Sequence, residues 1–298
     1  MSDYWDWEQL EHSEEWILYP DNIGERLCLD EVSLSDGELY TVLTNAKPRT
    51  QKGSLIAMIK GVKSSDITDV ISKIPVEKRN LVKEISVDMA NNMEKAASAS
   101  FGRASIVTDR FHVAKLVNEA VQEIRIKFRW EAIEEENNLI KKSRETGVKY
   151  ETKTFENGDT KKQLLARSRY LLFKSASKWT TSQKKRADIL FSEYPDIKKA
   201  YELSMMFRNI YELAKSKNEA EQLFLKWYKK VIEKDYPAFI TASQSILNHK
   251  EHILNFFVNR TTNALAETFN SKIKAFRASF RGVRDLSFFL YRVSLIFA

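Results

Sequence analysis

The sequence has very few of the residues from which several common functional sites are built. Of its 298 residues, one is cysteine and four are histidine. An internal disulfide framework and a cysteine-based zinc site are therefore excluded, and four histidines leave little room for a metal site enclosed by histidines. The eight glycines form no G-x-G pair and no G-x-x-x-x-G-K-[ST] sequence, which excludes the dinucleotide-binding and Walker phosphate loops. The scarcity of cysteine also indicates a reducing compartment.

Long apolar runs are missing as well. No stretch of 18 apolar residues occurs, and the N-terminus is acidic, unlike the basic start of a signal peptide. We therefore expect a soluble, globular and cytoplasmic protein that has no membrane partner.

Charge is distributed unevenly along the chain. Residues 1–25 contain eight acids and no lysine or arginine, whereas the remainder carries a net charge of +15. Nine basic residues and no acid fall within 161–186, and seven basic residues with two acids fall within 260–292. Such clusters suit a polyphosphate partner, because each phosphate contact releases counterions. A solvated helix face is the alternative for either cluster.

The first third of the chain has the pattern of a mixed sheet. Turn sequences separate short apolar runs at 26–32, 39–44 and 55–59, which predict an antiparallel meander. A helix (64–74), a strand (82–87), a short helix (91–100) and a fifth strand (104–108) follow. The order βββαβαβ predicts the α/β class.

Long helices are predicted from residue 112 onward. The domain prediction is an acidic, tryptophan-rich segment (1–25), an α/β core (26–112 and 258–298) and a helical region (113–257) that contains the basic segment 161–186. Trp5, Trp7 and Trp16 of the first segment could dock onto another chain or onto the basic surface of this one. A frayed tail is the alternative.

Three acids stand out by position. Asp30 lies late in the first predicted strand, Asp88 ends the fourth, and Glu267 lies on the polar face of a helix predicted over 263–277. The two strands are expected to be neighbours, so these carboxylates can converge. Oxygen ligands suit Mg²⁺, and two ions about 3.5–4 Å apart can stabilise the attacking and leaving oxygens of a phosphodiester displacement. Strand-end aspartates are also common turn or cap residues, and the spacing leaves both interpretations open.

Three sequence blocks carry a family resemblance. They are Leu29-Asp30-Glu31 followed by Tyr40-Thr41-Val42; Val87-Asp88-Met89 followed by the D-R-F-H-V sequence of residues 109–113; and N-A-L-A-E-T-F-N-S-K-I-K at 263–274 followed by F-R-G-V-R at 280–284. In this order and at these distances they resemble bacterial insertion-sequence transposases with the DDE catalytic fold, those of the ISL3 group above all. The resemblance covers residues 26 to about 297.

The resemblance implies an RNase H-like fold with a large helical insertion before the last catalytic helix. It also implies metal-dependent DNA strand cleavage and strand transfer of an insertion sequence. Asp30, Asp88 and Glu267 would be the catalytic metal ligands, with Mg²⁺ or Mn²⁺ as two ions and Asp30 bridging both. Asp109 and His112 match a D-x-x-H motif that would brace the insertion or the DNA. For His112 alone, a backbone-satisfied helix histidine is an equal alternative.

Candidate DNA contacts come from both basic clusters. Those beside the predicted active site are Lys272, Lys274, Arg277 and Arg281, with Asn263 and Asn270 as auxiliary polar residues; those of the helical region are Arg167, Arg169, Lys184 and Lys185. Tyr170, Phe173 and Trp179 could stack on a flipped base, although their spacing beside Leu171 and Leu172 favours a place in the core.

The expected partner is double-stranded DNA, as element ends and as target, with a homodimer pairing the two ends. A bacterial, nucleoid-associated location follows from this. Only 29 residues precede Asp30, without a C-x-x-C pair, so terminal-repeat recognition is expected from a separate protein, or the chain is a truncated remnant. Two other functions stay open: an inactive or domesticated DNA-binding protein of the same fold, and a related nuclease that cuts without joining.

Overall fold

The computed structural model describes residues 2–34, 37–47, 51–260, 264–280 and 284–298. The chain forms two compact units. The first, here called the α/β unit, comprises Met1–Val113 and His249–Ala298, and the second, the helical unit, comprises Ala114–Asn248. Among the described residues, no helix has the length and apolar character that crossing a bilayer requires.

The α/β unit is built on a six-stranded sheet with the order β1-β4-β3-β2-β5-β6. Its strands are β1 (Trp16–Leu18), β2 (Arg26–Ser33), β3 (Leu39–Asn45), β4 (Leu55–Lys60), β5 (Glu84–Val87) and β6 (Ser105–Thr108). Neighbours are antiparallel from β1 to β2, whereas β2, β5 and β6 are parallel. This confirms the predicted mixed, RNase H-like sheet, in which the first and fourth predicted strands are neighbours.

The acidic N-terminal segment contributes a strand that the sequence pattern did not predict. β1 is only three residues long and pairs with β4, where Ile17 lies opposite Met58. Farther toward the N-terminus, the Tyr4 ring packs on Phe288 and its hydroxyl donates to the Asp285 carboxylate at 3.2 Å. The segment is therefore tied to the C-terminal helix of its own unit by aromatic packing and by the Tyr4–Asp285 hydrogen bond.

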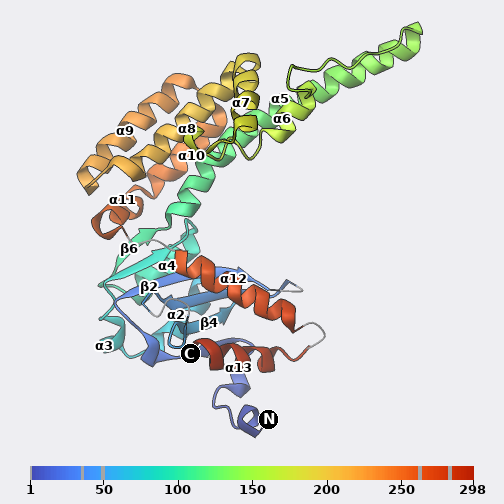
Figure 1. Cartoon of the computed structure of the whole chain (residues 1–298). Helices are drawn as coiled ribbons and strands as arrows, with labels where there is room; N and C mark the ends of the chain where they lie inside the picture. Colours follow the sequence, from blue (N-terminus) through green and yellow to red (C-terminus); the bar gives the residue numbers. More distant parts are fainter. Residues whose placement is uncertain (1, 35–36, 48–50, 261–263, 281–283) are drawn as a thin grey trace. The chain divides into compact units, whose positions relative to one another are not determined.

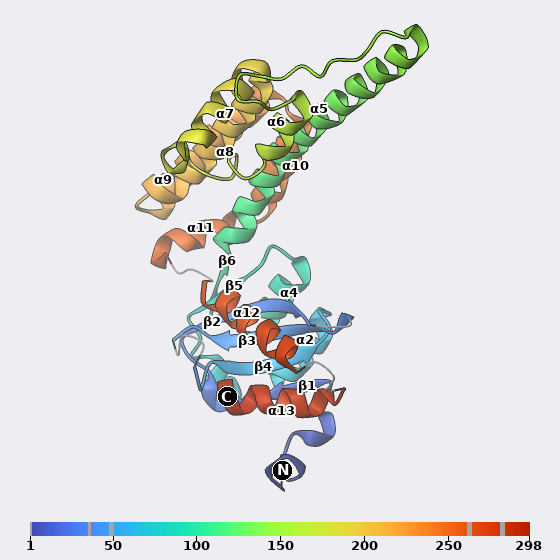
Figure 2. The same cartoon turned by 45° about the vertical axis from the view of Figure 1, so that its right-hand side comes forward.

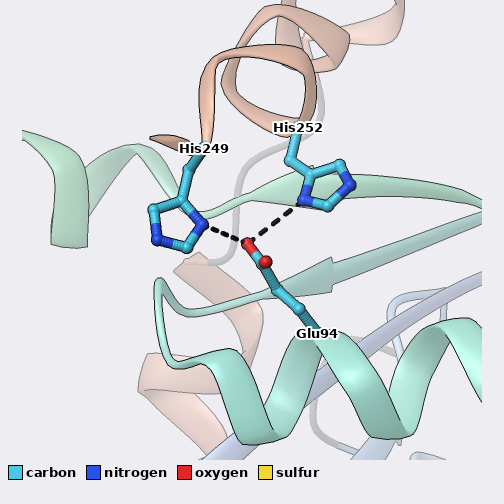
Figure 3. A group of neighbouring side chains, drawn as sticks. All are labelled: Glu94, His249 and His252. Carbon is cyan, nitrogen blue, oxygen red and sulfur yellow. Dashed lines mark hydrogen bonds and ion pairs between the residues drawn. The ribbon is translucent and has the colours of Figure 1, made fainter. Parts of the chain in front are cut away.

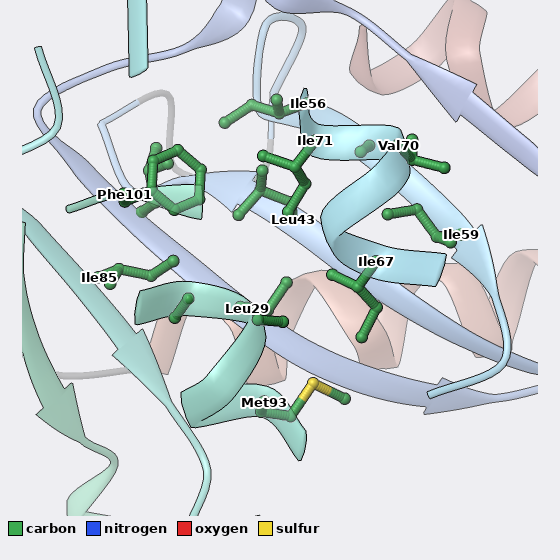
Figure 4. Close-up of a cluster of buried hydrophobic side chains, with 14 of the residues drawn as sticks. Leu29, Leu43, Ile56, Ile59, Ile67, Val70, Ile71, Ile85, Met93 and Phe101 are labelled. Carbon is green, nitrogen blue, oxygen red and sulfur yellow. The ribbon is translucent and has the colours of Figure 1, made fainter. Parts of the chain in front are cut away.

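Two helices cover one face of the sheet. α2 (Ser64–Ser72) and α4 (Asn91–Ser100) bury apolar side chains against alternate strand residues. Figure 4 shows Leu29, Leu43 and Ile85 of the sheet packed with Ile67 and Ile71 of α2 and Met93 of α4. Along the chain, the short helix α3 (Val76–Arg79) follows α2 and precedes β5.

Two C-terminal helices cover the opposite face. α12 (Ala264–Ser279) presents Phe269 and Ile273, and α13 (Leu286–Phe297) presents Phe289 and Val293, all of them fully buried. Their partners in the sheet include Val32 and Val42. The i, i+4 spacing of Phe269 and Ile273 on α12 matches the predicted apolar stripe. The helix lies against β2 (Figure 1).

The helical unit is built from α5 (Arg110–Thr146), α6 (Lys161–Arg167), α7 (Thr181–Glu193), α8 (Pro195–Leu213), α9 (Lys217–Lys234) and α10 (Pro237–Asn248). α5 begins in the α/β unit and continues into this one. Capping boxes start α6 at Thr160 and α7 at Thr180. Helices α7 to α10 pack as successive neighbours (Figure 2). Trp227 of α9 is buried, and its indole N–H donates to the Leu203 carbonyl of α8 at 3.0 Å.

The helix that follows returns to the α/β unit. α11 (Lys250–Asn259) lies within the helical region predicted from sequence, but it contacts β6, and Asn255 Nδ2 donates to the Ile106 carbonyl at 2.9 Å. The compact helical unit therefore ends at Asn248.

Candidate active site

Three parallel strands bring three aspartates to one edge of the sheet. Leu29 of β2 is aligned with Val87 of β5, and Val87 is aligned with Thr108 of β6. The next residue in each case is an aspartate: Asp30, Asp88 and Asp109. The Asp109 backbone N–H donates to the Val87 carbonyl at 2.8 Å, which keeps the end of β6 in register with the end of β5. The pairing pattern thus gathers acids that are 79 residues apart in sequence.

Strand alternation directs the Asp30 side chain toward α12, because Leu29 points into the core beneath α2 and α4 and the next residue of β2 points to the opposite face. The Asn270 amide of α12 meets Asp30 there, because its Nδ2 donates to Asp30 Oδ2 at 2.8 Å. The same nitrogen lies 3.3 Å from the Glu31 carbonyl oxygen. Asn270 therefore joins α12 to the β2 side of the acidic edge. Asp88 follows the end of β5, and its Oδ1 accepts from the Ala90 backbone N–H at 2.8 Å in the turn before α4.

Asp30 is a buried carboxyl group with 8% of its surface exposed. Its Oδ1 accepts from the Glu31 backbone N–H at 2.8 Å. Burial raises the pKa of Asp30 to about 6; the Glu31 hydrogen bond and His112 lower it, and the charges of Asp88 and Asp109 raise it further. The protein therefore holds negative charge at this point against a considerable electrostatic cost.

This raised pKa predicts how the metal-free protein responds to pH. The folded chain keeps the Asp30 proton between pH 4 and 6, where the unfolded chain has lost it, so the free energy of unfolding should fall as pH rises through that window. A shift from 3.8 to about 6 corresponds to a loss of about 3 kcal/mol. Urea unfolding in a chelating buffer at several pH values measures it.

The matched comparison uses two single variants. Asp30→Asn should flatten the pH dependence, and Glu31→Gln, at an exposed position of the same strand, should retain it. Equal slopes in all three proteins would show that the Asp30 environment is not as described.

Glu267 joins the same electrostatic cluster from α12. It lies one helical turn before Asn270, and residues three apart share a helix face. Partial burial raises the pKa of Glu267, as does the charge of Asp109, whereas His112 lowers it. Asp109 and His112 thus act on the pKa of both Asp30 and Glu267, so the four residues lie near enough to interact electrostatically.

Asp109 is closer to this centre than the sequence pattern indicated. It is 5% exposed, its Oδ1 accepts from the Phe111 N–H at 3.1 Å, and its Oδ2 lies 3.8 Å from His112 Nε2. The D-x-x-H motif suggested a bracing role, and the hydrogen bond to Phe111 at the start of α5 fits it. The strand register also makes Asp109 a candidate metal ligand, since it follows the buried strand β6 as Asp88 follows the buried strand β5.

The donor set of this cluster is entirely oxygen except for His112. Carboxylates with an amide neighbour are the ligands that Mg²⁺ and Mn²⁺ prefer. Burial is the main cause of the raised pKa of Asp30, with a smaller contribution from the charges of Asp88 and Asp109, and a bound cation would offset both. The donor types therefore suit a divalent ion, although in the described part of the chain the ligand atoms of Asp30, Asp88 and Glu267 do not all lie within 4.8 Å of one another.

A comparison with protein-family models identifies the family of the chain. The model of a transposase family, the ISL3 group of the DDE type, matches residues 27–293. The chain belongs to this family. No curated protein gave a significant match. DDE transposases use divalent metal ions and act on DNA, so the family agrees with the oxygen-rich cluster described above.

In this ISL3-family chain the basic residues predicted beside the acids have different environments. Lys272 and Lys274 are exposed on α12. Arg277 is 8% exposed: its Nη2 lies 2.8 Å from Glu38 Oε1, and its guanidinium stacks over the Phe289 ring. Arg281 and Asn263 lie outside the described residues.

The basic segment of the helical unit is partly neutralised by acids from outside it. Lys161 pairs with Glu135 at 2.9 Å, and Arg167 contacts the buried Asp159. Arg169, Lys184 and Lys185 are exposed.

The aromatic residues of the same segment divide in a similar way. Trp179 packs on Phe191 and Tyr201 and donates its indole N–H to the Leu171 carbonyl, whereas Tyr170 is 65% exposed.

Proposed function

We propose that the chain is an active DDE transposase that cleaves DNA strands and transfers an insertion sequence by two-metal phosphoryl transfer. One observation carries the proposal. The parallel register of β2 and β5 aligns Leu29 with Val87, and α12, which carries Glu267, lies against β2. This arrangement supports a site built from Glu267 and the two aspartates that follow the aligned residues, Asp30 and Asp88. Three carboxylates that converge on two ions are what the chemistry requires.

Asp30, Asp88 and Glu267 would hold the ions, with Asp30 shared between them. Bound divalent ions supply charge neutralisation at the scissile phosphate and lower the pKa of the attacking water or 3′-hydroxyl. Asn270 acts as a positioning residue, since its hydrogen bond to Asp30 Oδ2 fixes the orientation of that carboxylate. His112, 3.8 Å from Asp109, would offset part of the negative charge beside Glu267.

DNA would be held through its phosphates. Lys272 and Lys274 are exposed on the helix that carries Glu267, and they are the cations we assign to the backbone near the reacting strand. Arg277 serves instead to anchor α12 through Glu38. In the helical unit, Arg169, Lys184 and Lys185 would contact DNA farther away, with Tyr170 as the exposed ring for stacking. A homodimer would pair the two element ends.

The test uses DNA from either side of the coding sequence, because an insertion sequence encodes its own transposase. Labelled fragments carrying these flanks are incubated with the full chain and Mg²⁺ or Mn²⁺. Site-specific nicking that releases a 3′-hydroxyl supports the proposal. A pre-cut end that is then joined to a plasmid separates a transposase from a nuclease. Binding without cleavage under every condition would identify a DNA-binding scaffold.

The phosphate contacts assigned to α12 give a separate prediction. Removing both positive charges, in Lys272→Ala/Lys274→Ala, should weaken DNA binding by at least about tenfold at moderate salt and reduce the slope of log affinity against log salt by about two. Fluorescence anisotropy at several salt concentrations measures both quantities.

Lys83→Ala is the control, since Lys83 is an exposed lysine paired with Glu25 in the same unit. If the double variant kept the wild-type salt slope, the phosphate contacts would lie elsewhere.

A further inference from the structure

Two of the four histidines meet a glutamate away from the acidic edge. His249 caps the start of α11, His252 lies one turn later on the same face, and Glu94 belongs to α4. His249 Nδ1 is 2.7 Å and His252 Nδ1 is 3.1 Å from the same atom, Glu94 Oε1 (Figure 3). The side chains of Glu94 and His249 are 15% and 12% exposed, and that of His252 is 32% exposed.

This arrangement leaves one ring nitrogen poorly satisfied. His252 Nδ1 has no solvent contact and, within the described part of the chain, makes no hydrogen bond of proper geometry. It lies close to Glu94 Oε1, yet the oxygen is off the direction in which the ring nitrogen donates or accepts. A buried polar atom without a well-directed partner costs free energy. A partner placed among the three side chains would remove that cost.

The spacing of the three groups suits a metal ion. One ligand atom from each residue can be chosen so that all lie within 4.8 Å of one another. Ligand atoms around a tetrahedral zinc ion, each at about 2.0–2.1 Å, are about 3.3 Å apart. The Nδ1 atoms of His249 and His252 would have to move only slightly away from Glu94 Oε1 for an ion to bind among the three atoms.

The chemistry of the donors selects the kind of ion. Two imidazoles and one carboxylate form a known zinc ligand set that leaves one position for water. Mg²⁺ strongly prefers oxygen ligands, so the ion of the acidic edge does not suit this group. The two sites therefore call for different metals.

The geometry points to a zinc site formed by Glu94, His249 and His252 that fastens α11 to α4. α4 begins three residues after Asp88, and α11 is hydrogen-bonded to the strands of the acidic edge through Asn255 on Ile106 and Asn259 on Glu84. His249 is the first residue of the α/β unit after the helical unit. The ion would thus hold the returning chain against the helix that follows Asp88.

Calorimetric titration of the chelator-treated full chain with Zn²⁺, in millimolar Mg²⁺, tests this inference. We expect one zinc ion per chain and a rise of about 5 °C or more in the unfolding midpoint at saturating zinc. His252→Gln should weaken zinc binding at least about a hundredfold and abolish the rise. Glu94→Gln, which has nearly the same shape, should weaken binding too, and serves if the histidine variant does not fold.

Two controls separate this site from others. His12→Gln alters a histidine that stacks on Trp16 and should bind zinc as the wild type does. Asp88→Asn, which disables the proposed catalytic site, should also retain zinc binding, so the two proposals can fail independently. Absence of saturable zinc binding in the wild type, or equal binding by His252→Gln, would overturn the inference.

Discussion

Asp30→Asn is expected to abolish metal-dependent DNA cleavage, with a loss of about a thousandfold or more. The substitution keeps the size of the side chain and one oxygen that can accept from Asn270, but it removes the negative charge that two ions would share. Metal ions stabilise the transition state of phosphoryl transfer by several kcal/mol, and each 1.4 kcal/mol or so corresponds to a factor of ten in rate. Cleavage of the flanking-DNA substrate measures the loss.

The charge at position 30 must be distinguished from a general effect on the strand. Glu31→Gln changes an exposed acid at the next position of β2, which points away from α12, and should leave cleavage within about twofold of the wild type. Circular dichroism and DNA affinity should match in all three proteins. Because burial of the Asp30 charge is costly, the asparagine variant should be at least as stable as the metal-free wild type above pH 6. Retention of substantial cleavage by Asp30→Asn would remove Asp30 from the metal site.

Asp159→Asn is expected to destabilise the helical unit by about 3 kcal/mol. The Asp159 side chain is fully buried and receives Arg186 Nε at 2.8 Å and Arg167 Nη1 on its two oxygens. Arg186 is itself largely buried, and loss of one member of a buried ion pair leaves the other without compensation, which typically costs about 3–5 kcal/mol. We expect the lower end of this energy range because the Arg167 side chain is exposed to solvent. Urea unfolding measured by circular dichroism gives the change.

The same carboxylate predicts an acid-sensitive stability. Burial would raise the pKa of Asp159, but the hydrogen bonds from Arg186 and Arg167 outweigh it and hold the pKa below 3.8. Its stabilising effect is therefore complete above pH 4 and is lost as pH falls through the lowered pKa. The control is Glu135→Gln, which breaks the exposed pair with Lys161 and should cost less than about 1 kcal/mol. Equal costs in the two variants would contradict the buried network.

The sequence alone determined which segments form most of the strands and which side of each element faces the core. Short apolar runs bounded by turns predicted five of the six strands, in their order along the chain, and the same pattern placed Asp30 and Asp88 directly after buried strand residues. The apolar stripe of α12 indicated which edge of that helix carries Glu267. These features are local: a period of two or of 3.6 residues decides which side of an element faces the core.

Tertiary structure determined which residues distant in sequence are in contact. The strand W-I-L of β1 is too short for a pattern of its own and exists because β4 offers a free edge. Arg277 has the sequence context of a phosphate ligand, yet Glu38 and Phe289 enclose it. The contacts of Asn270 with Asp30 and of Glu94 with His249 and His252 join residues that only strand register and helix packing bring together. Such contacts depend on the whole set of packed elements, because no local periodicity records which distant side chain will fill a given space.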